Sequence, residues 1–74
     1  MRILYINNDG GGFAKYIEVE TGMTVGEFFS LKMPERDANG YLIRVNQLDC
    51  TPDQALRADD RISITPTKIR GARG

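Results

Sequence analysis

The segment from Thr24 to Pro34 constrains the fold most, because it carries the longest helical pattern of the chain and that pattern is short. Thr24 is a favoured N-cap residue, and Glu27 follows it at the spacing of a capping box. Pro34 ends the helix, since a proline disfavours helical geometry in the residue before it. The pattern therefore predicts a helix over residues 25–32. Its apolar stripe consists of Val25, Phe28 and Phe29, with Leu31 as a further candidate.

A helix of this length is unstable alone in water, so it must lie across a sheet. Five segments have the β-branched and aromatic composition of strands. They are residues 1–7, 13–20, 41–45, 48–50 and 61–65. The Asn-Asp-Gly-Gly-Gly run of residues 8–12 predicts a hairpin turn between the first two strands. A Thr-Pro start with glutamine three residues after the threonine predicts one short helical turn within residues 51–56.

The order of these elements predicts one mixed sheet wrapped around one helix. If the first and last strands pair side by side, the connection between them crosses the face of the sheet through the helix. Alternation along each strand selects the side chains that face the helix. We expect the core to contain Ile3, Tyr5, Ile17, Val19, Val25, Phe28, Phe29, Ile43, Val45, Leu48, Leu56, Ile62 and Ile64.

Composition limits the classes of protein to which the chain can belong. Its 74 residues suffice for one small domain. Cys50 is the single cysteine and histidine is absent, so neither an internal disulfide nor a Cys/His metal cluster is expected. Ten basic residues balance ten acidic ones, which argues against nucleic-acid binding by bulk charge. No apolar run is long enough to span a bilayer and no signal peptide is recognised, so we expect a cytoplasmic protein.

The last residues have a composition different from the rest. We expect the folded domain to cover residues 1–66 and a flexible tail to cover residues 67–74. The tail contains the basic residues Lys68, Arg70 and Arg73 together with Gly71 and Gly74. Glycine lacks a Cβ, so a narrow channel in a partner can close around its backbone and reach a carboxylate. Solvated positive charge that keeps a tail soluble is the alternative interpretation of the basic residues.

An apolar patch is expected on the sheet face opposite the helix. Leu42 points away from Ile43 if residues 41–45 alternate. Together with Leu4 or Ile6 of the first strand, Leu42 could form an exposed patch, and such patches often mark partner sites. Scattered exposed leucines are also common on ordinary surfaces.

The chain resembles the ubiquitin-like, β-grasp family, and within it the small sulfur carriers of molybdopterin and thiamine biosynthesis. Residues 1–7 lie where those proteins place their first strand, and residues 43–47 resemble their strand followed by an Asn-Gly turn, with Gln47 in place of the glycine. Residues 56–64 resemble their entry into the last strand. The resemblance covers nearly the whole chain and implies an α+β, β-grasp fold with a mixed four- to five-stranded sheet packed on one helix.

The resemblance also implies a function. In this family a separate E1-like adenylating enzyme activates a C-terminal glycine carboxylate with ATP, for thiocarboxylate formation or conjugation. The reactive residue here would be Gly74, or Gly71 if a tail-processing protease removes residues 72–74. The last residues lack the usual C-terminal Gly-Gly pair. By this interpretation the protein is not itself an enzyme, carries no cofactor, and uses Leu4, Ile6, Leu42, Lys68, Arg70 and Arg73 to bind its partner.

Two alternatives remain open at the level of sequence. The chain could be a noncovalent β-grasp subunit of a larger complex that uses its sheet face and leaves the tail idle. It could also be a relative that has lost adenylation and is retained for regulation.

Cys50 has no histidine to activate it, so the sequence favours an idle thiol over a nucleophile.

Overall fold

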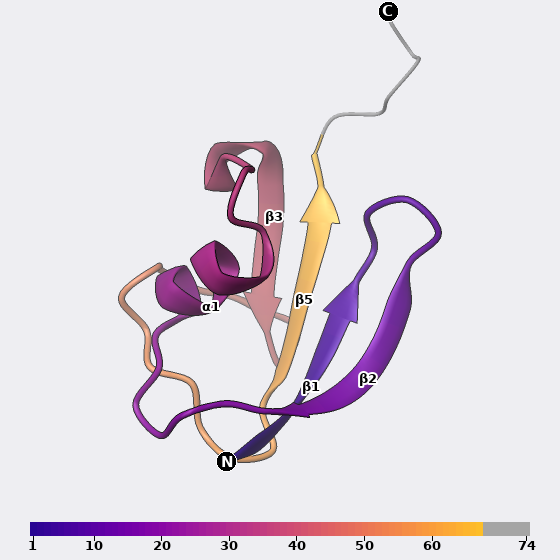
Figure 1. Ribbon diagram of the computed structural model, residues 1–74. Helices are drawn as coiled ribbons and strands as arrows, with labels where there is room; N and C mark the ends of the chain where they lie inside the picture. The colour runs from indigo at the N-terminus through magenta and orange to yellow at the C-terminus, as the bar shows by residue number, and fades with distance from the viewer. Residues whose placement is uncertain (68–74) are drawn as a thin grey trace, which may run out of the picture.

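The computed structural model describes residues 1–67, which form a mixed β-sheet with one α-helix packed on one of its faces (Figure 1). The strands are β1 (Arg2–Asn7), β2 (Phe13–Glu18), β3 (Tyr41–Val45), β4 (Leu48–Asp49) and β5 (Arg61–Pro66). The helices are α1 (Val25–Lys32) and the short 3-10 helix η1 (Ala38–Gly40). The strands lie side by side in the order β2-β1-β5-β3-β4. This arrangement confirms the predicted α+β architecture.

Strand β5, the last in sequence, occupies the middle of the sheet. It runs parallel to β1, with Tyr5 opposite Ile62, and antiparallel to β3, with Ile43 opposite Ile64. The other two strand pairs are antiparallel hairpins. Because β1 and β5 are parallel neighbours, the chain must cross the sheet between them, and α1 lies in that crossing on one face (Figure 1).

Helix α1 begins and ends where the sequence predicts. The Thr24 hydroxyl accepts a hydrogen bond from the Glu27 backbone N–H over 3.1 Å. In return the Glu27 carboxylate accepts one from the Thr24 backbone N–H over 3.0 Å, which completes the capping box. At the other end Met33 closes the helix by donating its N–H to the Phe29 carbonyl over 2.7 Å. These contacts close both ends of a helix that has only eight residues.

The core lies between α1 and the covered face of the sheet. Its fully buried members include Phe28 of the helix and Ile3, Ile62 and Ile64 of the two central strands. The remaining buried apolar side chains are Tyr5, Val25, Phe29, Met33, Val45 and Leu56. Of the predicted core residues, Ile17, Val19 and Ile43 are only partly buried and pack at its border. Sequence reasoning did not include Met33 or the buried polar residue Asn7.

The prediction that Leu48 is buried is wrong, since 70% of its surface is exposed. Leu48 lies opposite the buried Val45 in the register of β3 and β4. However, β4 is the outermost strand of the sheet and has only two residues. A leucine at that edge has strand neighbours on one side only, so it remains exposed although its partner is buried.

The predicted helical turn within residues 51–56 is also wrong. Those residues form turns and an isolated bridge between Thr24 and Ala55 instead. The carbonyls of Pro52 and Gln54 accept hydrogen bonds from Gly26 and Val25, each over 2.9 Å. The first backbone N–H groups of a helix have no partner within it. This loop supplies partners for two such groups of α1, and that tertiary role prevails over its own weak helical signal.

Four strand boundaries differ by one or two residues from the prediction: β1 begins one residue later and β5 ends one residue later than expected. Strand β2 ends at Glu18 and not at residue 20, although Val19 still donates its N–H to the Met1 carbonyl over 2.8 Å. β4 ends at Asp49, one residue earlier than expected. Residues 1–67 include no helix with the length and apolar composition needed to cross a membrane.

Candidate functional site

The sheet face opposite α1 carries the apolar residues that the sequence singled out. In β1 the buried Ile3 and Tyr5 face the helix, so Leu4 and Ile6 face the other way and are half-buried. In β3, Ile43 lies at the border of the core and Leu42 points oppositely, with 40% of its surface exposed. We call this side of the sheet the outer face.

The outer face brings Leu4 and Ile6 together but separates them from Leu42. β5 lies between β1 and β3, and its outward residues Ser63 and Thr65 stand opposite Ile6 and Leu42 respectively. A polar hydroxyl row therefore divides the apolar surface into two parts. The expected patch is consequently discontinuous across β5.

A second cluster on the outer face was not identified from the sequence. Leu4 is flanked across the sheet by Tyr16 of β2 on one side and Arg61 of β5 on the other. The guanidinium of Arg2 lies over the Tyr16 ring, 4.9 Å from its centroid. We call Arg2, Leu4, Tyr16 and Arg61 the arginine cluster; together with the Asn46–Gln47 turn and Asp59 they line a hollow of about 400 Å³. The alternation that turns Ile62 inward could have located Arg61 on this face.

The chain leaves the sheet at a defined point beside η1. Thr67, the last described residue, donates its backbone N–H and its hydroxyl to the Gly40 carbonyl, over 3.0 and 3.1 Å. The end of β5 is thereby held next to the beginning of β3. The predicted tail starts at Thr67, and its predicted site residues lie outside the described part of the chain; they are Lys68, Arg70, Gly71, Arg73 and Gly74.

Cys50 has the environment of an unreactive thiol. Burial and the nearby Asp49 carboxylate raise its pKa, while a hydrogen bond from the Val45 backbone to the sulfur acts in the opposite direction. The sulfur lies 3.4 Å from the Ile43 carbonyl, to which it donates. The thiolate is the nucleophilic form, so a raised pKa disfavours reaction at neutral pH. This agrees with the sequence-based interpretation of Cys50 as an idle thiol.

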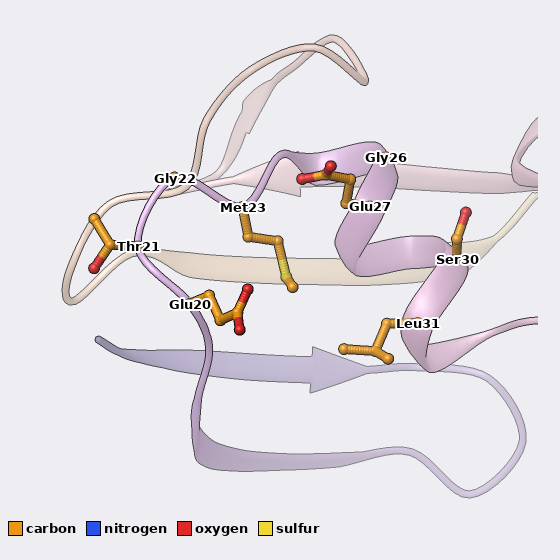
Figure 2. Close-up of a pocket in the computed structure, with 8 residues that line it drawn as sticks. All are labelled: Glu20, Thr21, Gly22, Met23, Gly26, Glu27, Ser30 and Leu31. Atoms are coloured by element: carbon orange, nitrogen blue, oxygen red, sulfur yellow. The ribbon is translucent and has the colours of Figure 1, made fainter.

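Another hollow lies between α1 and the loop that precedes it (Figure 2). In Figure 2 the side chains of Met23, Leu31 and Glu20 extend into the same space, whereas Ser30 points away from it. Glu27 also lines this hollow, but its carboxylate is engaged in the capping box. Among residues 1–67 no group of three or more His, Cys, Asp or Glu side chains is placed to hold a metal ion. The hollow is therefore no candidate metal site in the described part of the chain.

Comparisons with known proteins bear on the fold. No protein-family model matches the sequence, and no curated protein matches it. Among solved structures, the chain is similar to a ubiquitin-like protein from the hyperthermophilic archaea Caldiarchaeum subterraneum, with a TM-score of 0.70. The two share 16% sequence identity over 93% of this chain and 99% of the other. With the strand order and the single packed helix, this likeness shows that the chain has an α+β fold of the ubiquitin-like, β-grasp type.

Proposed function

We propose that this chain is a ubiquitin-like or sulfur-carrier-like protein of the cytoplasm whose C-terminal glycine is activated by a separate E1-like adenylating enzyme. In this account the sheet is the part that the enzyme grips, and the tail supplies the reacting carboxylate. The reactive residue is Gly74, or Gly71 after a protease has removed residues 72–74. The protein would itself perform no chemistry.

The observation that carries this proposal is the way β5 ends. β5 is paired on both sides, and the hydrogen bonds of Thr67 to Gly40 hold its end in place. The sequence after that anchor is Lys68-Ile69-Arg70-Gly71-Ala72-Arg73-Gly74. A rigid central strand that leads into a short glycine-bearing segment suits delivery of a terminal carboxylate to another protein's active site.

The reaction is a nucleophilic substitution followed by acyl transfer. The terminal carboxylate oxygen attacks the α-phosphorus of ATP, and pyrophosphate leaves to give an acyl-adenylate. A sulfur donor of the sulfide or persulfide type, or a cysteine thiol or lysine amine, then attacks the carbonyl carbon and AMP leaves. A persulfide route also needs a thiol to reduce the acyl disulfide that first forms.

Intact-mass spectrometry tests the proposal directly. The full chain is incubated with ATP, Mg²⁺ and each purified E1-like enzyme of the source organism, with and without sulfide. We expect a mass increase equal to an adenylate, and conversion to the thiocarboxylate when sulfide is added. Fragmentation should place the change at Gly74 or, in a processed form, at Gly71. An unchanged mass with every such enzyme would contradict the proposal.

A second candidate function is that of a noncovalent β-grasp subunit with an idle tail. The observation that favours it is exposure on the outer face, where 63% of Tyr16 and 40% of Leu42 are accessible. Exposed aromatic and aliphatic side chains of this kind are common at protein interfaces. Deletion of residues 68–74 separates the two functions, because it abolishes activation and leaves a noncovalent complex intact.

A further inference from the structure

The arginine cluster has unsatisfied charge. Within residues 1–67 the ion pairs join the N-terminus to Glu18 and Arg44 to Asp49, so neither Arg2 nor Arg61 has an ion-pair partner in this part of the chain. The one carboxylate that lines their hollow belongs to Asp59. Glu18 also stands opposite Arg2 in the register of β1 and β2, but its carboxylate pairs with the N-terminal amine. Within residues 1–67, the two guanidinium groups therefore share their hollow with one carboxylate, that of Asp59.

The two arginines are placed to act together. Arg61 lies opposite Leu4 in the parallel register of β1 and β5, and Arg2 lies two residues before Leu4 on the same face. The cation–π contact with the Tyr16 ring favours a position of the Arg2 guanidinium over that ring. A planar guanidinium with a free edge matches a carboxylate in a bidentate geometry.

Apolar surface adjoins this charge. Leu4 lies within the arginine cluster, and Ile6 follows two residues later on the same strand face. A ligand that satisfies both features carries a carboxylate directly beside an aliphatic or aromatic side chain. Sites for small molecules are concave and mostly apolar, whereas this hollow is open on a sheet face and polar in its lining.

We propose that the arginine cluster binds an acidic–apolar segment of a protein partner, with an Asp or Glu carboxylate on Arg2 and Arg61 and a neighbouring apolar side chain on Leu4 and Ile6. This proposal rests on the proposed function in one respect, that the outer face is where a protein docks. A polyanion such as nucleic acid fits less well, because Glu18 stands opposite Arg2, Asp59 lines the hollow, and the net charge of the chain is zero.

Selection from a displayed library of random linear peptides tests the specificity without knowledge of the partner. The full chain, the R2Q/R61Q variant and the R44Q variant are used as baits in parallel. We expect the full chain to enrich peptides in which Asp or Glu adjoins Leu, Ile or Phe, and R2Q/R61Q to lose that enrichment. R44Q is the matched control, because Arg44 lies on the same face but is paired with Asp49, and it should select as the full chain does.

A selected peptide then provides the quantitative test. Replacing its Asp or Glu by Asn or Gln should weaken binding by about tenfold or more, as for loss of a charge-assisted hydrogen bond. The R2K/R61K variant keeps the charge but not the planar fork, and should bind with intermediate affinity. Backbone amide shifts on titration should concentrate in β1 and β5. Circular dichroism checks that each variant is folded, which is expected because both arginines are exposed.

Three results would overturn the proposal: a selected consensus without acidic residues, the same consensus from R2Q/R61Q, or preferential binding of single-stranded oligo(dT) to the arginines. The selection involves neither ATP nor the terminal carboxylate. Its failure alongside successful adenylation would therefore reject the arginine site alone, and the reverse outcome would reject activation alone.

Discussion

The side-chain amide of Asn7 donates a hydrogen bond to the hydroxyl oxygen of Tyr5 over 2.8 Å, inside the core of the domain. Asn7 is 6% exposed and is the buried polar residue of the described chain. Its amide oxygen accepts the backbone N–H of Asp9 over 2.7 Å. Asn7 thus joins the covered face of β1 to the first turn of the chain.

Removal of the Asn7 side-chain amide should destabilise the fold. In Asn7→Ala the Tyr5 hydroxyl and the Asp9 N–H each lose a partner, so we expect the free energy of unfolding to fall by about 1–3 kcal/mol. Urea denaturation followed by circular dichroism measures it. Asn8→Ala is the control, since it removes the exposed hydrogen bond that the Asn8 side-chain amide donates to the Thr65 hydroxyl. Equal effects of the two substitutions would show that the buried bonds of Asn7 contribute nothing beyond an exposed one.

Gly26 lies where the loop that caps α1 approaches the helix closely. A Cβ at this position would lie 3.2 Å from both the Cβ and the carbonyl oxygen of Pro52. In an open helix alanine is favoured over glycine by about 1 kcal/mol, but overpacking against backbone costs about 1–3 kcal/mol. We therefore expect Gly26→Ala to lower thermal stability, whereas Gly11→Ala, where a Cβ meets open space, should change it little. A stabilised Gly26→Ala protein would contradict this account.

Glycine in place of Gln47 in the β3–β4 turn should stabilise the fold. Asn46 and Gln47 have φ values of 55° and 70°, the left-handed conformation of a two-residue hairpin turn. A side chain other than Asn or Asp is strained there by about 1–2 kcal/mol. Glycine avoids this strain, but the greater backbone entropy of glycine in the unfolded chain offsets part of the gain in stability. We expect Gln47→Gly to raise the melting temperature and Gln47→Val to lower it. The opposite order in calorimetry would mean that Gln47 makes a compensating contact.

Cys50 should be alkylated slowly because its pKa is raised, and the two causes of the raised pKa can be tested separately. Burial is the larger cause of its raised pKa and the Asp49 carboxylate the smaller. At mildly alkaline pH we expect iodoacetamide to alkylate Cys50 more slowly in the folded protein than in urea, with Asp49→Asn only partly restoring the rate. Arg44→Gln breaks the same surface ion pair but keeps the Asp49 charge, so it should not accelerate alkylation.

The raised pKa also has a thermodynamic consequence. The folded state holds the thiol proton more tightly than the unfolded state does, so this contribution to stability is present below the unfolded-state pKa. It is lost as the pH rises through the folded-state pKa. Cys50→Ser should remove this alkaline dependence from the stability curve.

The sequence predicted correctly those features that depend on residues close together in the chain, namely the ends of α1 and the face on which strand residues lie. The capping box of Thr24 and Glu27 and the stop at Pro34 gave the bounds of α1, and alternation placed Leu4, Ile6 and Leu42 on the outer face. The architecture followed because a helix of two turns needs a sheet to cover.

What the sequence could not predict depends on contacts between distant segments. Residues 51–56 carry a helix-start pattern, yet their carbonyls bond to the first N–H groups of α1. Leu48 has the composition of a core residue but lies at the sheet edge. The arginine cluster unites Arg2, Tyr16 and Arg61 only because β1 lies between β2 and β5, and no local pattern specifies that neighbourhood.

Release of pyrophosphate from ATP tests the central claim. This claim is that the folded domain docks on an E1-like enzyme and that the terminal carboxylate of the chain reacts there. The substrate is the chain ending at Gly74, or at Gly71, prepared both as the free acid and as the C-terminal amide, and supplied to the E1-like enzyme. The amide differs only at the reacting group. We predict pyrophosphate release with the acid, none with the amide, and competitive inhibition by the amide. Equal release with both forms, or no release with either acid, would contradict the account.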